Sequence, residues 1–292
     1  MRNGKKLLIM EAPLSVGSPT RGTEDAYRAL VGTGLDKALT GAAEFLPFDD
    51  ARTVTEKLCD DRLKHLETVM HVCRANYRRA RRAMMDSYIP VTLGGDHSLA
   101  MSSIAALSDR YGAERVAVIY VDAHTDINTE ETTPTGMIHG MPLAAAMGLC
   151  SDLPDVGRNK VNLFGKNTYI IGAHSIDPGE YPIIEEQGVH LYTADDVRAR
   201  GADEIVREVL SSVEGMKIHL SFDVDSINGD EFPATGYAMR DSLPLDTVLG
   251  VLEGVWRGAA VSSVDIVEYN PRRDVGGKCR DILFDIFKLF CE

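Results

Sequence analysis

The chain has 292 residues, of which 44% are hydrophobic and 26% are charged, close to the averages of globular domains. Its 31 Lys and Arg against 44 Asp and Glu give a net charge of −13. Binding to nucleic acid without sequence preference depends on Lys and Arg, so we expect no nucleic-acid partner.

The N-terminus and the cysteines indicate a cytoplasmic protein. The first apolar run, residues 7–10, is too short for the core of a signal peptide, and no window approaches the length of a transmembrane helix. The five cysteines are odd in number and show no paired CxxC spacing, which favours reduced thiols. We therefore expect a cytoplasmic location and no membrane partner.

Apolar β-branched runs alternate with amphipathic stretches along the chain. The runs predict strands at residues 6–10, 89–93, 115–121, 168–172, 189–192, 217–222 and 261–267. The amphipathic stretches predict helices at residues 23–30, 56–86, 98–110, 203–213, 245–256 and 279–290. This alternation is typical of a parallel sheet covered by helices on both faces. Without a repeat or a linker, the chain is predicted to form a single domain, 1–292, with a three-layer α/β/α fold and a mainly parallel sheet.

The most basic stretch, residues 74–82, falls inside the longest predicted helix. Apolar residues recur along this helix at steps of three and four, which is the spacing of one buried face. The arginines are therefore interpreted as its solvated face.

Three polar clusters each follow an apolar run. They are residues 94–97 (Gly-Gly-Asp-His), 122–128 (Asp-Ala-His-Thr-Asp-Ile-Asn) and 221–225 (Ser-Phe-Asp-Val-Asp). The carboxyl ends of parallel strands line the ligand crevice of an open α/β sheet, so the clusters can meet there. Asp122 and Asp126 would lie about 13 Å apart on a straight strand. The chain must therefore curl near His124 if both serve one site.

Together the clusters predict a metal site. Four carboxylates in one crevice repel each other strongly, and two divalent cations would cancel their charge. The donor set holds oxygen and imidazole but no thiolate, which suits manganese, while zinc, cobalt and iron remain compatible with it. A two-metal site supplies hydroxide at neutral pH, which indicates hydrolysis. A single Asp at a strand end can also be a turn residue or a helix N-cap, but the combination favours metal ligands. The expected ligands are His97, Asp122, His124, Asp126, Asp223 and Asp225.

These clusters resemble the ureohydrolases, the arginase and agmatinase family, and most closely the arginases. The resemblance continues, in the order usual for the family, through residues 138–142 (Ile-His-Gly-Met-Pro), 177–180 (Asp-Pro-Gly-Glu) and 268–271 (Glu-Tyr-Asn-Pro). It implies an arginase-like fold and a pair of manganese ions bridged by Asp122 and Asp223. It also implies a homo-oligomer, because the family usually forms trimers or hexamers.

The same resemblance implies roles for further residues. Asp126 would orient the hydroxide nucleophile, His139 would transfer a proton, and Glu268 would pair with the guanidinium group of the substrate. Four residues would contact the α-amino and α-carboxylate groups of the substrate: Asn128, Thr135, Asp177 and Glu180.

The hydrolysis of a guanidinium group explains why these residue types are needed. A guanidinium is a resonance-stabilised cation and a poor electrophile, so a carboxylate must hold it beside the nucleophile. The departing amine needs a proton, which a group that titrates near neutrality can give. The products would be urea and an amine, and the amine is ornithine when the small-molecule substrate is arginine.

The chain departs from the usual arginase pattern around the expected substrate. Met137 stands where many arginases have an asparagine that reads the carboxylate, and methionine cannot donate that hydrogen bond. His174 replaces an arginine, residues 226–229 (Ser-Ile-Asn-Gly) replace Gly-Leu-Asp-Pro, and Tyr237 with the following alanine replaces Thr-Pro. Losing one hydrogen bond to a carboxylate costs roughly 1.5–3 kcal/mol, which is enough to bias specificity but not to abolish it.

Three functions therefore stay open. The protein is an arginase that reads the amino-acid end through other groups, an agmatinase or guanidino-acid hydrolase, or a catalytically silent metal-binding protein. Arg240 is either a replacement carboxylate reader or a solvated loop residue. The remaining histidines are not expected to bind metal, and His219 is expected in the core: His65, His71, His190 and His219.

Overall fold

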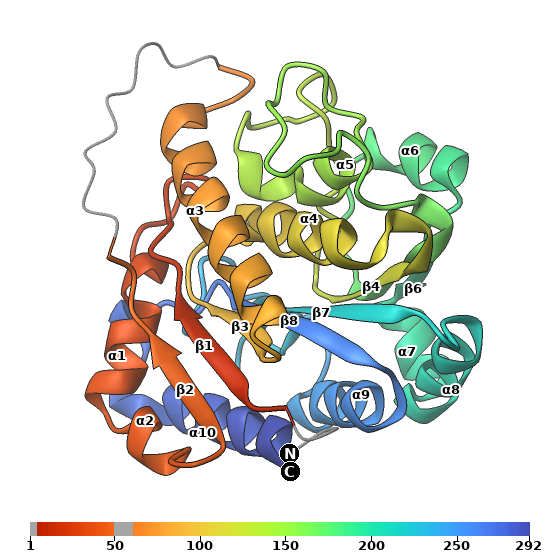
Figure 1. Cartoon of the computed structure of the whole chain (residues 1–292). Coiled ribbons are helices and arrows are strands. Elements are labelled where there is room, and N and C mark those ends of the chain that lie inside the picture. Colours follow the sequence, from red (N-terminus) through yellow and green to blue (C-terminus); the bar gives the residue numbers. More distant parts are fainter. Residues whose placement is uncertain (1–4, 50–60) are drawn as a thin grey trace.

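The protein, seen in a computed structural model that describes residues 5–49 and 61–292, is built on one parallel sheet. The described strands follow the order β2-β1-β3-β8-β7-β4-β5-β6, and every neighbouring pair is parallel (Figure 1). Their bounds are β1 Leu7–Glu11, β2 Ala43–Leu46, β3 Ile89–Leu93, β4 Val116–Val121, β5 Thr168–Ala173, β6 His190–Thr193, β7 Lys217–Asp223 and β8 Val261–Val267.

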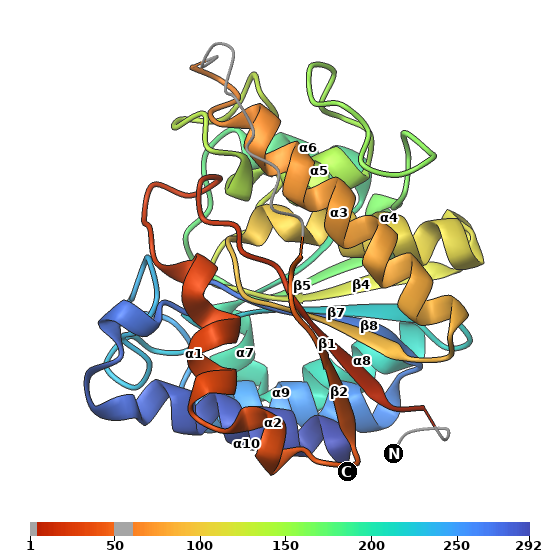
Figure 2. The ribbon, with the colours of Figure 1, turned by 60° about the vertical axis from the view of Figure 1, so that its left-hand side comes forward.

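Helices cover both faces of this sheet (Figure 2). One face carries α3 Leu66–Met85, α4 Ala100–Tyr111, α5 Pro142–Ala146 and α6 Glu180–Gln187. The other face carries α1 Ala26–Gly32, α2 Leu35–Ala38, α7 Ala194–Arg200, α8 Ala202–Ser212, α9 Leu245–Gly258 and α10 Lys278–Cys291. The predicted three-layer α/β/α fold is confirmed.

The central strands are buried on both sides. Along β4, Ala117, Ile119 and Val121 pack into the core beneath α7–α10, whereas Val118 and Tyr120 pack toward α3–α5. Successive side chains of a strand point to opposite faces, so a strand covered on both faces must be apolar throughout. This explains the continuous apolar runs of the sequence, which are confirmed as strands.

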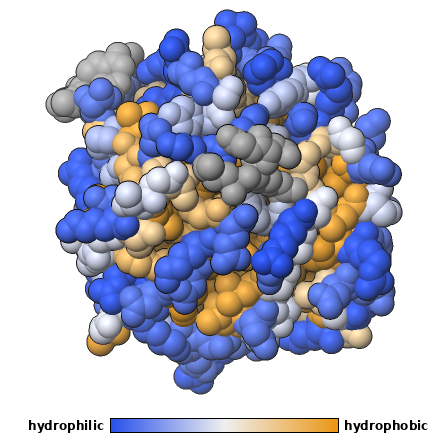
Figure 3. All heavy atoms as spheres, turned by 60° about the horizontal axis from the view of Figure 1, so that its bottom comes forward, coloured by the Kyte–Doolittle hydropathy of each residue, from blue (hydrophilic) through white to orange (hydrophobic). Residues whose placement is uncertain are grey.

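Figure 3 shows one face on which hydrophilic residues are spread between smaller apolar areas. Within the described ranges, no helix combines the length and the apolar character needed to cross a membrane.

The structure also contains elements that the sequence pattern did not predict. Strand β2 lies at the sheet edge and is only partly buried, so it lacks an apolar run. Four helices of four to eight residues, α2, α5, α6 and α7, are too short to show a clear period. The predicted helix at 56–86 begins only at Leu66, because Lys64 instead forms a bridge with Met137. Residues 56–60 of that prediction lie outside the described part.

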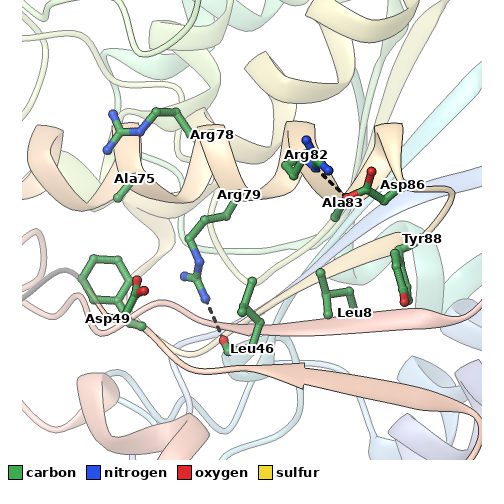
Figure 4. Close-up of a pocket in the computed structure, with 11 residues that line it drawn as sticks. Leu8, Leu46, Asp49, Ala75, Arg78, Arg79, Arg82, Ala83, Asp86 and Tyr88 are labelled. Atoms are coloured by element: carbon green, nitrogen blue, oxygen red, sulfur yellow. Dashed lines mark hydrogen bonds and ion pairs between the residues drawn. The ribbon is translucent and has the colours of Figure 1, made fainter.

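The interpretation of the α3 arginines as one solvated face is only partly right. Arg74, Arg78 and Arg82 are exposed, but Arg79 is half-buried. The guanidinium of Arg79 donates hydrogen bonds to the carbonyls of Glu11 and Leu46, at the ends of β1 and β2 (Figure 4). It satisfies backbone groups that are left unpaired where these strands end.

A tight turn at the end of β3 leads the chain to the first polar cluster. Gly94 and Gly95 have φ angles of +92° and +84°. A Cβ atom on Gly95 would lie 2.4 Å from Leu99 Cδ1 and 2.8 Å from the carbonyl oxygen of Ala12. Only glycine fits this conformation and this space, and the turn carries the chain directly to His97.

We predict that Gly95→Ala destabilises the protein more than Gly188→Ala. Both glycines have positive φ, but no atom lies within 4 Å of the Cβ position at Gly188. Left-handed strain alone costs roughly 1–2 kcal/mol, and the clash at Gly95 should add about 1–3 kcal/mol. Urea unfolding of the two variants measures the difference, and equal losses would show that the turn can relax.

Candidate metal centre and substrate cavity

Four adjacent strands bring the predicted clusters together. Strands β3, β8, β7 and β4 are neighbours at the centre of the sheet, and all run in the same direction. His97 follows β3, Asp122 follows β4, Asp223 ends β7 and Glu268 follows β8. Since the carboxyl ends of parallel strands lie at one edge, all four side chains reach the same crevice.

One group of ligands surrounds the ring of His97. Its Nδ1 atom lies 2.9 Å from an oxygen of Asp122, 3.1 Å from one of Asp223 and 3.2 Å from one of Asp126. A single ring nitrogen cannot hydrogen-bond to three carboxylates at once. His97 Nδ1 and Asp122 Oδ2 are buried without a hydrogen-bond partner among the described residues, which is rare for buried polar atoms. A cation placed among these atoms would satisfy them.

A second group lies beside the first. The Nδ1 atom of His124 is 3.4 Å from Asp122 Oδ1 and 3.2 Å from Asp225 Oδ2. Asp122 therefore faces His97 with one oxygen and His124 with the other, as a bridging carboxylate must. Asp223 turns one oxygen to His97, and its other oxygen accepts a hydrogen bond of 2.8 Å from the backbone N–H of Asp225.

The charges of these groups shift their pKa values. Burial, together with the charges of Asp225 and Asp122, raises the pKa of Asp223 well above its usual value. Burial alone would lower the pKa of His97, but the nearby carboxylates of Asp122, Asp126 and Asp223 raise it well above its usual value. Without cations the cluster thus retains protons, and a bound metal ion would take their place.

Two residues that the sequence analysis missed hold the ligands in place. Ser221 Oγ lies 2.8 Å from the second ring nitrogen of His97, and the Tyr120 ring stacks on the His97 ring at a centroid distance of 4.3 Å. The hydroxyl of Tyr120 also donates a hydrogen bond of 2.8 Å to Asp126. Such contacts orient metal ligands. The sequence offered one signal, since Ser221 has the same strand parity as Asp223.

The predicted curl of the chain is found at the second cluster. Asp126 has a φ of +47°, which is uncommon for a residue other than glycine. The turn brings its carboxylate back to His97, within 3.2 Å. Asp122 and Asp126 therefore serve one group although they lie four residues apart.

Glu268 and His139 face each other beside the metal ligands. His139 Nδ1 lies 3.5 Å from Glu268 Oε1, and the same oxygen accepts a hydrogen bond of 3.0 Å from the backbone N–H of His97. Burial alone would lower the pKa of His139, but Glu268 raises it. Burial also raises the pKa of Glu268, so this buried carboxylate is a natural receptor for a cation.

These residues line a cavity of about 200 Å³. Its inner end is formed by the carboxylates of the ligand groups and by Glu268. Its outer end brings together the four predicted substrate contacts and adds residues that were not predicted. The outer lining comprises Asn128, Thr133, Pro134, Thr135, Ser175, Asp177 and Glu180, while Tyr237 lies beside His124 and His139, next to the inner end.

The outer end of the cavity is acidic, and its side chains are held by hydrogen bonds to one another and to the backbone. Asn128 donates a hydrogen bond of 2.8 Å to Asp177. Glu180 accepts hydrogen bonds from the backbone N–H groups of Ile127 and Asp177, at 3.0 and 2.8 Å, and burial raises the pKa of Glu180 to about 7. Among the described residues that line the cavity there is no lysine or arginine.

Other departures from the arginase pattern lie outside the cavity. Met137 pairs with Lys64 in an isolated bridge, and His174 Nε2 lies 3.1 Å from Ser242 Oγ. The side chain of Arg240 is 82% exposed and forms an ion pair with Asp230 at 3.1 Å. Arg240 is therefore a solvated loop residue and does not line the cavity.

The remaining histidines do not join a metal cluster. His219 is fully buried, 2.9 Å from Ser263 Oγ and 3.1 Å from Asp265 Oδ2, which confirms the expectation of a core residue. His190 is exposed and stacks on Tyr169. Across residues 5–49 and 61–292, metal-binding groups of three or more residues are found only around His97 and His124.

A larger cavity, of about 400 Å³, lies between α3 and the strands β1 and β2 (Figure 4). Its floor is apolar, and two of its arginines are already engaged. Arg79 binds backbone carbonyls, and Arg82 forms an ion pair of 2.6 Å with Asp86. With no cluster of reactive groups among its described lining residues, this cavity is not the functional site.

The chain is similar to known arginases in sequence. The Arginase family model matches residues 5–286. The arginase of Bacillus caldovelox is 29% identical over 287 residues, which cover 95% of both chains. Arginase-1 of Mus musculus is 32% identical over 281 residues, 91% of this chain and 85% of its own.

Solved structures give the same result. The native structure of the Bacillus caldovelox arginase matches with a TM-score of 0.90 at 29% identity, covering 99% of both chains. The Entamoeba histolytica arginase, solved in complex with L-ornithine, matches with a TM-score of 0.89 at 27% identity over 98% of both chains. The chain therefore belongs to the arginase family of ureohydrolases, enzymes that hydrolyse guanidino groups.

Proposed function

We propose that the protein is a binuclear-manganese arginase that cleaves L-arginine to L-ornithine and urea. The observation that carries this proposal is the convergence of two metal-ligand groups with Glu268 and His139 on one cavity. The cytoplasmic location and the trimeric or hexameric assembly expected from the sequence remain predictions.

The donors fit a pair of hard cations. His97, Asp122, Asp126 and Asp223 would hold one ion, and His124 and Asp225 would hold the other, with Asp122 and Asp223 as bridges. The orphaned atoms His97 Nδ1 and Asp122 Oδ2 support this assignment. When bound, manganese would make hydroxide available at neutral pH.

The surrounding side chains position the guanidinium and move the proton. Glu268 would hold the guanidinium in a charge-assisted pair at the inner end of the cavity. Asp126, fixed by the Tyr120 hydroxyl, would orient the nucleophile. Glu268 raises the pKa of His139, which favours the protonated imidazole that would give its proton to the departing amine.

The outer end of the cavity supplies recognition of the α-groups. Asp177 and Glu180 would attract the α-amino group, since both carboxyl groups line the cavity. Asn128 and Thr135 are neutral residues that would contact the α-carboxylate. These neutral groups give a weaker attraction than a cation would, because hydrogen bonds between charged partners are roughly twice as strong.

A guanidino alkylamine such as agmatine is the second candidate substrate. The acidic outer end without lysine or arginine, together with Met137 outside the lining, favours a positively charged or neutral tail over a carboxylate. The same observation disfavours a guanidino acid that lacks an amino group. A catalytically silent metal-binding protein is disfavoured by the presence of both Glu268 and His139 on the cavity.

We predict urea release by the manganese-loaded protein when L-arginine, agmatine and 4-guanidinobutyrate are tested in parallel. L-Arginine should be cleaved more efficiently than 4-guanidinobutyrate, because the acidic outer end attracts the α-amino group of arginine, whereas 4-guanidinobutyrate offers only a carboxylate. A preference for agmatine would keep the ureohydrolase assignment but replace the substrate. Silence with all three would contradict the proposed activity.

We predict that Asp223→Asn lowers both bound manganese and turnover. The loss should exceed the roughly 10- to 100-fold effect of removing a residue that only supports a ligand. Metal content by mass spectrometry and urea release by a colorimetric assay measure it. Asp230→Asn is the matched control, because Asp230 is exposed and pairs only with the loop residue Arg240. Full metal content in Asp223→Asn would exclude it as a ligand.

We predict that His139→Ala keeps both metal ions but slows turnover by about 10²- to 10⁴-fold, the usual contribution of a general acid. His139 faces Glu268 and is not part of either ligand group. His190→Ala, a change at an exposed histidine, should leave the rate unaltered. Loss of metal from His139→Ala would instead assign it to the metal centre.

A further inference from the structure

Tyr237 lines the cavity beside the residues expected to do the chemistry. Its ring centroid lies 6.2 Å from that of His139 with an interplanar angle of 20°, and 6.0 Å from that of His124 at 73°. The residue is 41% exposed, and its hydroxyl has no hydrogen-bond partner among the described residues. The ring therefore borders the cavity without being tied to the protein by a polar contact.

The backbone next to Tyr237 is fixed relative to Glu268. Arg273 donates hydrogen bonds to the carbonyls of Thr235 and Gly236, at 2.8 and 3.1 Å. A Cβ atom on Gly236 would lie 3.8 Å from Glu268 Oε2, so the chain passes directly over this carboxylate. The segment that carries Tyr237 is thus anchored beside the proposed guanidinium receptor.

A guanidinium held by Glu268 would leave its flat faces open. The carboxylate binds the N–H groups at the edge of the planar cation, and guanidinium planes stack well on aromatic rings. A cation within about 6 Å of a tyrosine ring gains from cation–π attraction. Tyr237 is the one aromatic residue other than histidine among the described residues that line the cavity.

We propose that Tyr237 covers one face of the substrate guanidinium and so determines binding at the reacting end. This inference rests on the proposed ureohydrolase function. Because every guanidino substrate presents the same cation, the contribution is common to all of them, whatever tail they carry. The contribution of Tyr237 offsets the lack of a cationic side chain that would bind the substrate carboxylate at the outer end. Substrate binding therefore depends more on the guanidinium than on the α-groups.

The test distinguishes the effect of the aromatic ring of Tyr237 from the effects of its bulk and of its hydroxyl group. Tyr237→Phe keeps the ring, and Tyr237→Leu keeps an apolar cover but removes the π-system. Tyr181→Leu is the matched control, since Tyr181 is exposed on α6 and does not line the cavity. Michaelis constants and kcat for L-arginine and agmatine, and manganese content, are measured for each variant.

We expect Tyr237→Leu to raise KM by about three- to thirtyfold for both substrates alike, with little change in kcat and unchanged manganese content. Tyr237→Phe should remain within about twofold of the natural protein, as should Tyr181→Leu. An unchanged KM in Tyr237→Leu would overturn the proposal. An equal loss in Tyr237→Phe would overturn it too, because the hydroxyl would then be responsible.

A binding measurement keeps this inference distinct from the proposed activity. Calorimetric titration of the manganese-loaded protein with methylguanidine, which has no tail to reach the outer end, reports the guanidinium site alone. Tyr237→Leu should weaken this binding by the same factor as the change in KM. If the natural protein released no urea from any substrate, the proposed ureohydrolase activity would be wrong. The titration would still show whether the Tyr237 ring contributes to guanidinium binding.

Discussion

The mutual repulsion of four buried aspartates is the constraint on which the rest of the site depends. Asp122, Asp126, Asp223 and Asp225 are all less than one-tenth exposed, and their charges cannot be screened by water. The raised pKa of Asp223 expresses this cost. The fold can hold these four carboxylates together only if protons or cations lie between them. The cluster therefore favours the binding of positive charge.

The sheet supplies the rigidity that this arrangement demands. Strands buried on both faces fix the directions of His97, Asp122 and Asp223, because packed helices leave them no room to turn away. Local strain completes the geometry. Asp126 and Glu268 both adopt positive φ, and each is held by hydrogen bonds. The Asp126 carboxylate accepts one from the Tyr120 hydroxyl. The Glu268 backbone N–H donates one to the Gly95 carbonyl, and its carboxylate accepts one from the His97 N–H. Such strain is characteristic of functional sites.

The two ends of the cavity follow different physical rules. At the inner end, carboxylates converge to hold cations, and neither Glu268 nor His139 departs from the motif of the arginase family. At the outer end, the chain offers acidic and neutral groups, whereas the aromatic Tyr237 lies beside His124 and His139. In the proposed function, the inner end would set the reaction class, and the outer end would set the choice among guanidino compounds.

The sequence by itself determined the α/β class and seven of the strands, and it predicted the types of metal ligand, because apolar runs and the polar clusters after them are local patterns. It also placed Asn128, Thr135, Asp177 and Glu180 in the substrate region, and all four line the cavity. Tertiary structure alone decided that β3, β8, β7 and β4 lie side by side, which joins residues more than 100 positions apart. The tertiary structure also revealed the edge strand β2 and the contacts by which Tyr120 and Ser221 orient His97. It further showed that Arg240 and Met137 do not line the cavity. Strand order and loop packing depend on contacts between distant segments, and no local pattern in the chain encodes those contacts.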